Sequence, residues 1–182
     1  MSNTGPSGFR ISSEIRPHAY DPVTNPELFE GVLARRVIAF FIDMIIIAIP
    51  VMLAGAFIWI LGLITFGFGW FLFWLWWPAA VIWTLIYHGV TLGSPASATI
   101  GMRVMDLQMR SWHGAPAYFL LGVAHTAVFY LFWVGLPLLA PFILLAGFFN
   151  ERRRLPHDYL LGIVIINRPA GAQLAAGNQS TS

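Results

Sequence analysis

The sequence has no cysteine and few charged side chains. Of its 182 residues, 58% are hydrophobic, 15% are aromatic and 10% are charged, whereas about 25% of the residues in an ordinary soluble domain are charged. The lack of cysteine excludes a disulfide scaffold, a thiolate metal site and a cysteine nucleophile. The 10 basic and 8 acidic side chains cannot cover the core of a water-soluble chain of this length. The sequence therefore predicts a protein surrounded by lipid.

Long uncharged runs divide the chain into expected membrane spans. Residues 1–31 are polar and form an expected cytoplasmic leader without the apolar run of a signal peptide. The first two expected spans are residues 37–64, interrupted only by Asp43, and residues 70–87. Residues 88–116 contain glycine, serine, proline and two arginines, so we expect a polar connection outside the hydrocarbon.

The next run, residues 117–149, has 33 uncharged residues. One helix of that length would be about 50 Å long, which exceeds a bilayer core of about 30 Å. Gly135 and Pro137 indicate a break between two short spans, 117–134 and 136–149. This division places all ten basic residues, every one an arginine, on one side of the membrane, as the positive-inside rule favours. A single span would instead place the four arginines after residue 149 on the opposite side of the membrane.

We therefore predict an all-α fold, a polytopic transmembrane bundle of four spans with both termini in the cytoplasm. The fourth span is short, and we expect it to be tilted or re-entrant. Residues 32–167 form the expected transmembrane domain, and residues 168–182 are an expected disordered tail. The apolar YLLGIVII at 159–166 is too short to span, so it either lies at the interface or pairs as a strand with RVMDLQM at 103–109.

Asp43 is the one charge placed clearly within lipid, where a carboxylate costs up to roughly 3 kcal/mol. Arg36 lies seven residues earlier, two helical turns away on the same face. One interpretation is a proton, cation or substrate site, and the other is a buried ion pair that fixes helix register. Arg35 points about 100° away and is an expected membrane-surface anchor.

Other polar residues also have a functional and a structural interpretation. His125 lies within the third expected span. There it either relays protons or forms a hydrogen bond with a neighbouring helix. Asp158 follows three arginines and opens an apolar stretch, which is typical of a capping or interfacial carboxylate. No two histidines have the i, i+4 spacing of a zinc helix, so we expect no metal and no cofactor. No intramembrane protease or hydrolase motif is present, and we expect no enzyme.

Three segments, in order, resemble the RDD family of bacterial membrane proteins, named for one arginine and two aspartates. ARRVIAFFIDMIII contains the arginine and first aspartate seven residues apart, here Arg36 and Asp43. TIGMRVMDLQ resembles the loop after the second span, with Thr99, Gly101 and Arg103. LPHDYLLGIVII resembles the closing segment and places the second aspartate at Asp158.

The resemblance implies a transport role, with cation/proton antiport as one form, and it favours pairing of Arg36 with Asp158 at the cytoplasmic edge. We expect either transport of ions or small solutes with Asp43 as the proton or cation site, or a non-transporting scaffold in which Arg36, Asp43 and Asp158 are structural. Four spans without a clear internal repeat are few for a complete transporter. We therefore expect the lipid bilayer, further membrane subunits or a homo-oligomer as partners, and no nucleic acid.

Overall fold

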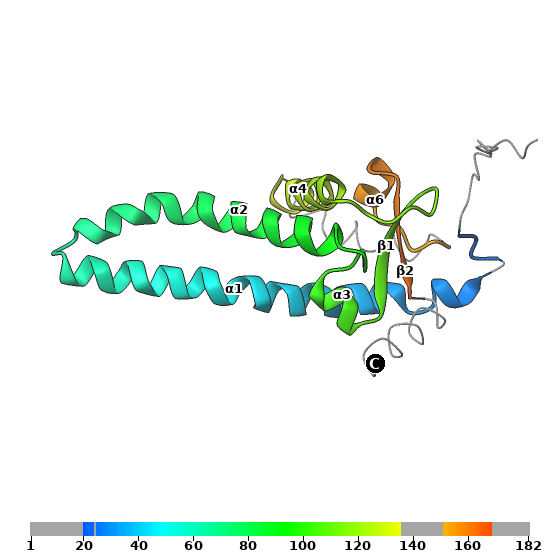
Figure 1. The fold of residues 1–182 in the computed structure, drawn as a ribbon, viewed down its shortest axis with the longest axis horizontal. Coiled ribbons are helices and arrows are strands. Elements are labelled where there is room, and N and C mark those ends of the chain that lie inside the picture. Colours follow the sequence, from blue (N-terminus) through cyan, green and yellow to red (C-terminus); the bar gives the residue numbers. More distant parts are fainter. Residues whose placement is uncertain (1–19, 24, 136–150, 169–182) are drawn as a thin grey trace, which may run out of the picture.

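One long helical hairpin dominates the fold (Figure 1). Helices α1 (Val32–Ile64) and α2 (Phe73–Leu92) run side by side and are joined through a turn and the 3-10 helix η2 (Phe68–Leu72). The computed structural model describes residues 20–23, 25–135 and 151–168. At about 1.5 Å per residue, the 33 residues of α1 extend for about 50 Å, so its first turns reach beyond a hydrocarbon core of about 30 Å.

The smaller elements gather where α1 begins (Figure 1). We call this group the cap: η1 (Pro26–Leu28), α3 (Ile100–Val104), β1 (Leu107–Ser111), α6 (Pro156–Leu160) and β2 (Ile163–Asn167). The cap holds the main buried apolar cluster, which side chains from α1, α2, both strands and their connections form together. This core lies at one end of the hairpin. It therefore holds the start of α1 against the segments that follow α2 in the chain.

The two strands pair antiparallel, with Leu107 opposite Asn167 and Ser111 opposite Ile163. The expected pairing between residues 103–109 and 159–166 is therefore present, but it begins later in both segments. Residues 100–104 form the helix α3, and α6 occupies 156–160. The described chain is mostly helical as predicted, and this is its one β-sheet.

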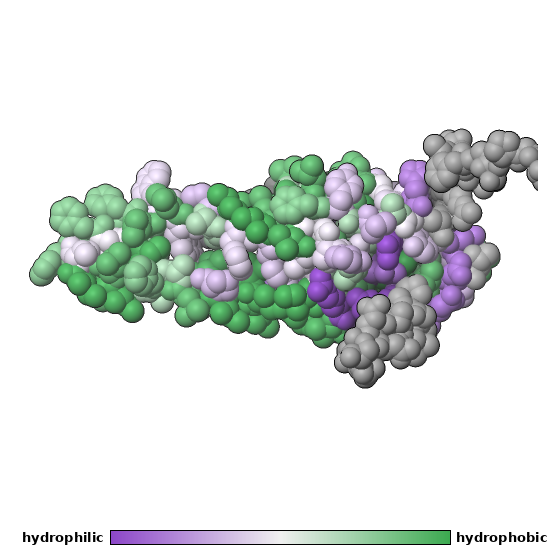
Figure 2. All heavy atoms as spheres, in the orientation of Figure 1, coloured by the Kyte–Doolittle hydropathy of each residue, from purple (hydrophilic) through white to green (hydrophobic). Residues whose placement is uncertain are grey.

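The hairpin outside the cap exposes apolar side chains along both helices (Figure 2). The most apolar windows of α1 and α2 are only 11% and 6% buried, and both helices are long and apolar enough to cross a membrane. Trp74 and Met52 are 85% and 70% exposed. The core helix of a soluble protein would bury such side chains, so the hairpin fits a lipid environment.

Both hairpin helices extend toward the cap beyond the expected spans. α1 begins at Val32 instead of residue 37, and the added turn carries the two arginines toward the cap. α2 continues past residue 87 to Leu92, because this end packs closely on α4 (Phe119–Gly135). A Cβ on Gly122 would lie 2.9 Å from the carbonyl oxygen of His88, so only glycine permits this approach.

Helix α4 corresponds to the third expected span, but its 17 residues extend for only about 25 Å. Figure 1 shows α4 nearly end-on while α1 and α2 lie in the plane of view, so α4 crosses the hairpin instead of running along it. The ring of Phe129 lies 5.7 Å from that of Phe40 on α1. The fourth expected span, 136–149, falls outside the described residues, and the four-span bundle remains a prediction.

Candidate functional site

Arg36 and Asp158 form a two-pronged ion pair between α1 and α6. Arg36 Nη1 donates to Asp158 Oδ2 at 2.7 Å, and Nη2 donates to Oδ1 at 3.1 Å. The Asp158 side chain is fully buried and that of Arg36 is 10% exposed. A planar guanidinium matches a carboxylate in this geometry, and burial strengthens the attraction. The contact expected between these two residues is therefore present.

Asp158 also has the capping role that its position after the arginines suggested. Its Oδ2 accepts a hydrogen bond from the backbone nitrogen of Leu155, the N-cap of α6, at 2.9 Å. Burial would raise the pKa of Asp158, but the Arg36 guanidinium and the neighbouring His125 and His157 outweigh it, so the pKa lies well below the usual range. The carboxylate therefore stays ionised at neutral pH.

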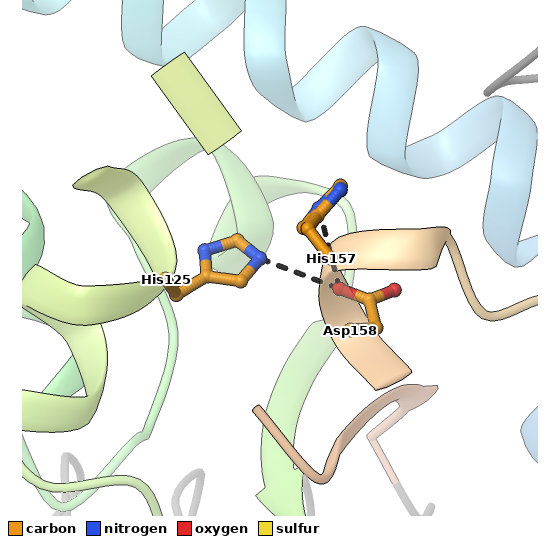
Figure 3. Close-up of side chains that lie close together, drawn as sticks. All are labelled: His125, His157 and Asp158. Atoms are coloured by element: carbon orange, nitrogen blue, oxygen red, sulfur yellow. Dashed lines mark ion pairs between the residues drawn. The ribbon is translucent and has the colours of Figure 1, made fainter. Parts of the chain in front are cut away.

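Two histidines approach the same carboxylate oxygen (Figure 3). The Nε2 atoms of His125 on α4 and His157 on α6 lie 3.4 and 3.3 Å from Asp158 Oδ1. Burial lowers the pKa of His157 to about 4, although the charge of Asp158 opposes that shift. His157 is therefore neutral at pH 7, and its contact with Asp158 is not an ion pair there.

Asp43 lies apart from this pair, in a separate set of hydrogen bonds. Its Oδ1 accepts from the Tyr87 hydroxyl at 2.5 Å and from the backbone nitrogen of Gly101 at 2.8 Å. Its Oδ2 accepts from the Thr99 hydroxyl at 2.5 Å. No arginine among the described residues reaches ion-pair distance of Asp43, so the expected three-residue charge cluster divides into two sites along one face of α1.

The loop segment Thr99, Gly101 and Arg103 holds Asp43 in place. Thr99 is the N-cap of α3 and accepts from Met102 N at 3.1 Å while its hydroxyl donates to Asp43. A Cβ on Gly101 would lie 2.2 Å from the carbonyl oxygen of Ala39, so glycine is required for α3 to touch α1. Arg103 Nε donates to the Ala98 carbonyl at 3.0 Å, which fixes the preceding turn.

Sequence reasoning did not identify Tyr87 or His157. Tyr87 reaches Asp43 across 44 positions of sequence, and no local spacing indicates such a contact. His157 appeared only as the neighbour of Asp158, and His125 lies on a different element. Arg35, expected at the membrane surface, is exposed and donates to Asn167 Oδ1 at 3.5 Å at the cap.

A cavity of about 240 Å³ connects the two sites. Apolar side chains make up most of its wall. The polar residues that also line it are Arg36, Asp43, His88, Thr99, His125, Thr126, Tyr130 and His157. A water molecule occupies about 30 Å³ in the liquid, so the cavity has room for an ion with several waters or for a small solute.

The family model described as the RDD family matches residues 31–162. The match covers α1 through α6 and all of Arg36, Asp43, Thr99, Gly101, Arg103 and Asp158. No curated protein and no solved structure matches the chain.

Proposed function

The chain belongs to the RDD family, and from that premise we propose that it is an integral membrane protein whose cavity binds a small cation during transport. The observation that carries the proposal is the polar part of the cavity wall, which Asp43, Thr99 and the histidines supply from α1, α2, α4 and the cap. Ionisable groups at membrane depth are costly and commonly mark ion pathways.

Asp43 is the cation or proton site in this proposal. Tyr87 and Thr99 place two hydroxyl oxygens beside its carboxylate. In the structure both hydroxyls donate, but a hydroxyl rotates and also accepts. Hard cations prefer carboxylate and neutral oxygen ligands, so this group would coordinate a cation once the hydroxyl hydrogens turn away.

The proposed orientation places the cap in the cytoplasm of a bacterial cell, with the chain in the inner membrane. All eight arginines of the described residues lie in the cap, in its connecting loops or in the first turns of α1. The positive-inside rule favours that side. A homo-oligomer or a second membrane subunit would complete the pathway, because the one hairpin and crossing helix of the described residues do not enclose a channel.

Cation flux into proteoliposomes tests the proposal. We expect wild-type protein to exchange Na⁺, Li⁺ or K⁺ for protons, measured with an internal pH dye, and Asp43→Asn to lose that flux while keeping its size-exclusion profile. Arg35→Gln is the matched control, because Arg35 is an exposed polar residue of the same helix. Unchanged flux in Asp43→Asn contradicts the proposal, and absence of flux with all three ions contradicts transport by this chain alone or as a homo-oligomer.

A second candidate function is a non-transporting scaffold or assembly factor. The observation that favours it is that Asp43 accepts three hydrogen bonds, from α2, the N-cap of α3 and α3 itself. Such a group joins the cap to the hairpin whether or not an ion binds. This candidate predicts that Asp43→Asn lowers the melting temperature and cellular abundance, and that wild-type protein shows no flux.

A further inference from the structure

Two histidines and an aspartate, from two elements far apart in sequence, direct ligand atoms at one point. His125 comes from α4, and His157 and Asp158 come from the start of α6 (Figure 3). The nitrogen and oxygen atoms that they offer all lie within 4.8 Å of one another. His157 and Asp158 are 1% and 0% exposed.

Among the described residues, no hydrogen bond of ordinary geometry satisfies the histidine nitrogens at this point, although two of them lie close to Asp158 Oδ1. This holds for Nε2 of His125 and for both ring nitrogens of His157. Buried polar atoms are normally satisfied, so unsatisfied ones call for an explanation such as a bound ion. Asp158 Oδ1 can also bind a further partner. It accepts one hydrogen bond of 3.1 Å from Arg36, whereas Oδ2 accepts two shorter ones.

We propose that His125, His157 and Asp158 bind one Zn²⁺ ion. Zinc bonds to nitrogen and oxygen are about 2.0–2.1 Å long, so neighbouring ligands of a tetrahedral site lie about 3.3–3.4 Å apart. The two histidine nitrogens lie 3.4 and 3.3 Å from Asp158 Oδ1, which matches two edges of that tetrahedron. Two imidazoles with one carboxylate are a donor set that zinc accepts, with the fourth position open.

The surroundings suit a bound ion in two further respects. Both histidines line the cavity, which leaves room for water or another ligand at the fourth position. Arg36 stays on Asp158 Oδ2, so the carboxylate bridges the guanidinium and the metal and orients the ligand oxygen.

Zinc binding is tested separately from the proposed transport function, although His125 and His157 line the same cavity as Asp43. The group around Asp43 consists of oxygens and suits hard cations, whereas this group contains two nitrogens. Binding is therefore measured on detergent-purified full-length protein, where no flux is needed.

The test is Zn²⁺ stoichiometry by equilibrium dialysis of chelator-treated protein, purified with a tag that lacks histidine. We expect one ion per chain in wild type. We expect His125→Ala and His157→Ala to bind at least about 100-fold more weakly, since the loss of even an outer partner costs 10- to 100-fold. His113→Ala, which removes an exposed histidine, and His88→Ala, which removes a cavity histidine outside the cluster, are expected to keep the wild-type affinity.

A second measurement needs no substitution. Co²⁺ in place of Zn²⁺ is expected to give wild-type protein the strong visible absorption of a tetrahedral site, and one equivalent of Zn²⁺ should abolish it. The proposal is overturned if wild type binds no stoichiometric Zn²⁺ and gives no such spectrum. It is also overturned if folded His125→Ala retains full affinity, or if His113→Ala or His88→Ala loses as much affinity as the cluster variants.

Discussion

Tyr87 illustrates how a single hydroxyl on α2 connects α1 with the start of α3. It donates to Asp43 Oδ1 at 2.5 Å, and its oxygen lies 3.4 Å from the backbone nitrogen of Ile100. Asp43 is 5% exposed, so water does not replace a lost donor easily. Each bond at this carboxylate therefore has a larger effect than a hydrogen bond at the surface.

Tyr87→Phe is expected to destabilise the protein by about 1–3 kcal/mol, because it leaves a buried charged acceptor short of one donor. The measurement is thermal unfolding in detergent. Tyr118→Phe is the matched control, since that tyrosine is 60% exposed, and we expect no change for it. Equal melting temperatures for Tyr87→Phe and wild type would show that the hydroxyl does not hold Asp43.

The His157 side chain makes stability depend on pH. Its pKa of about 4 in the folded protein lies below the ordinary 6.5, so the unfolded chain binds more protons between these values. Stability therefore rises with pH through this window and is lost as pH falls from about 6.5 to 4. The shift corresponds to roughly 3 kcal/mol. Asp158, whose pKa is also lowered, adds a loss only below its ordinary value of 3.8.

We expect the melting temperature of chelator-treated wild type to fall between pH 7 and pH 4.5, and His157→Gln to show a much smaller fall. Because the two profiles are compared as slopes, a uniform loss of stability in the variant does not affect the result. His113→Ala should keep the wild-type slope. Parallel profiles for wild type and His157→Gln would assign the pH dependence to another group.

Among the elements, α3 shows most clearly what the sequence could and could not predict. The Thr99-Gly101-Arg103 segment resembled the family loop, but its role became visible only where α3 meets α1. Spans and strands were predictable because apolar runs and β-branched residues are local patterns. The hydrogen-bond partners of Asp43 were not predictable. Tyr87 and Thr99 lie 44 and 56 positions away from it, and contacts over such distances leave no periodic pattern in the sequence. Arg36 and Asp158 could be paired only through the family resemblance.

Gly101→Ala is expected to be severely destabilising and to release α3 from α1. The added Cβ would lie 2.2 Å from the Ala39 carbonyl oxygen, and backbone on both sides resists movement. Gly55→Ala is the control, because its Cβ would meet only the side chain of Trp76, at 3.3 Å, within a helix where alanine is favourable. The measurement is the folded fraction by size exclusion. Similar yields from both variants would contradict the close contact between α1 and α3.

At the scale of the whole molecule, hydrophobic and hydrophilic surface are separated along the hairpin (Figure 2). The cap and the turn at Phe68 lie at opposite ends (Figure 1). The described α1 is long enough to carry one end through a bilayer, whereas α4 crosses the hairpin. Among the described residues, the hairpin is therefore the part whose orientation labelling can test.

Cysteine labelling tests that topology directly, because the chain has no cysteine to remove. Phe68→Cys introduces a thiol at the turn, where the side chain is 77% exposed. Ala115→Cys introduces one in the exposed loop between β1 and α4. With a membrane-impermeant maleimide, we expect position 68 to react in intact cells and position 115 only in inverted vesicles, since the arginine-rich cap favours the cytoplasm. Reaction of both thiols from one side would mean that the turn does not reach the opposite face, so that the hairpin does not cross the membrane.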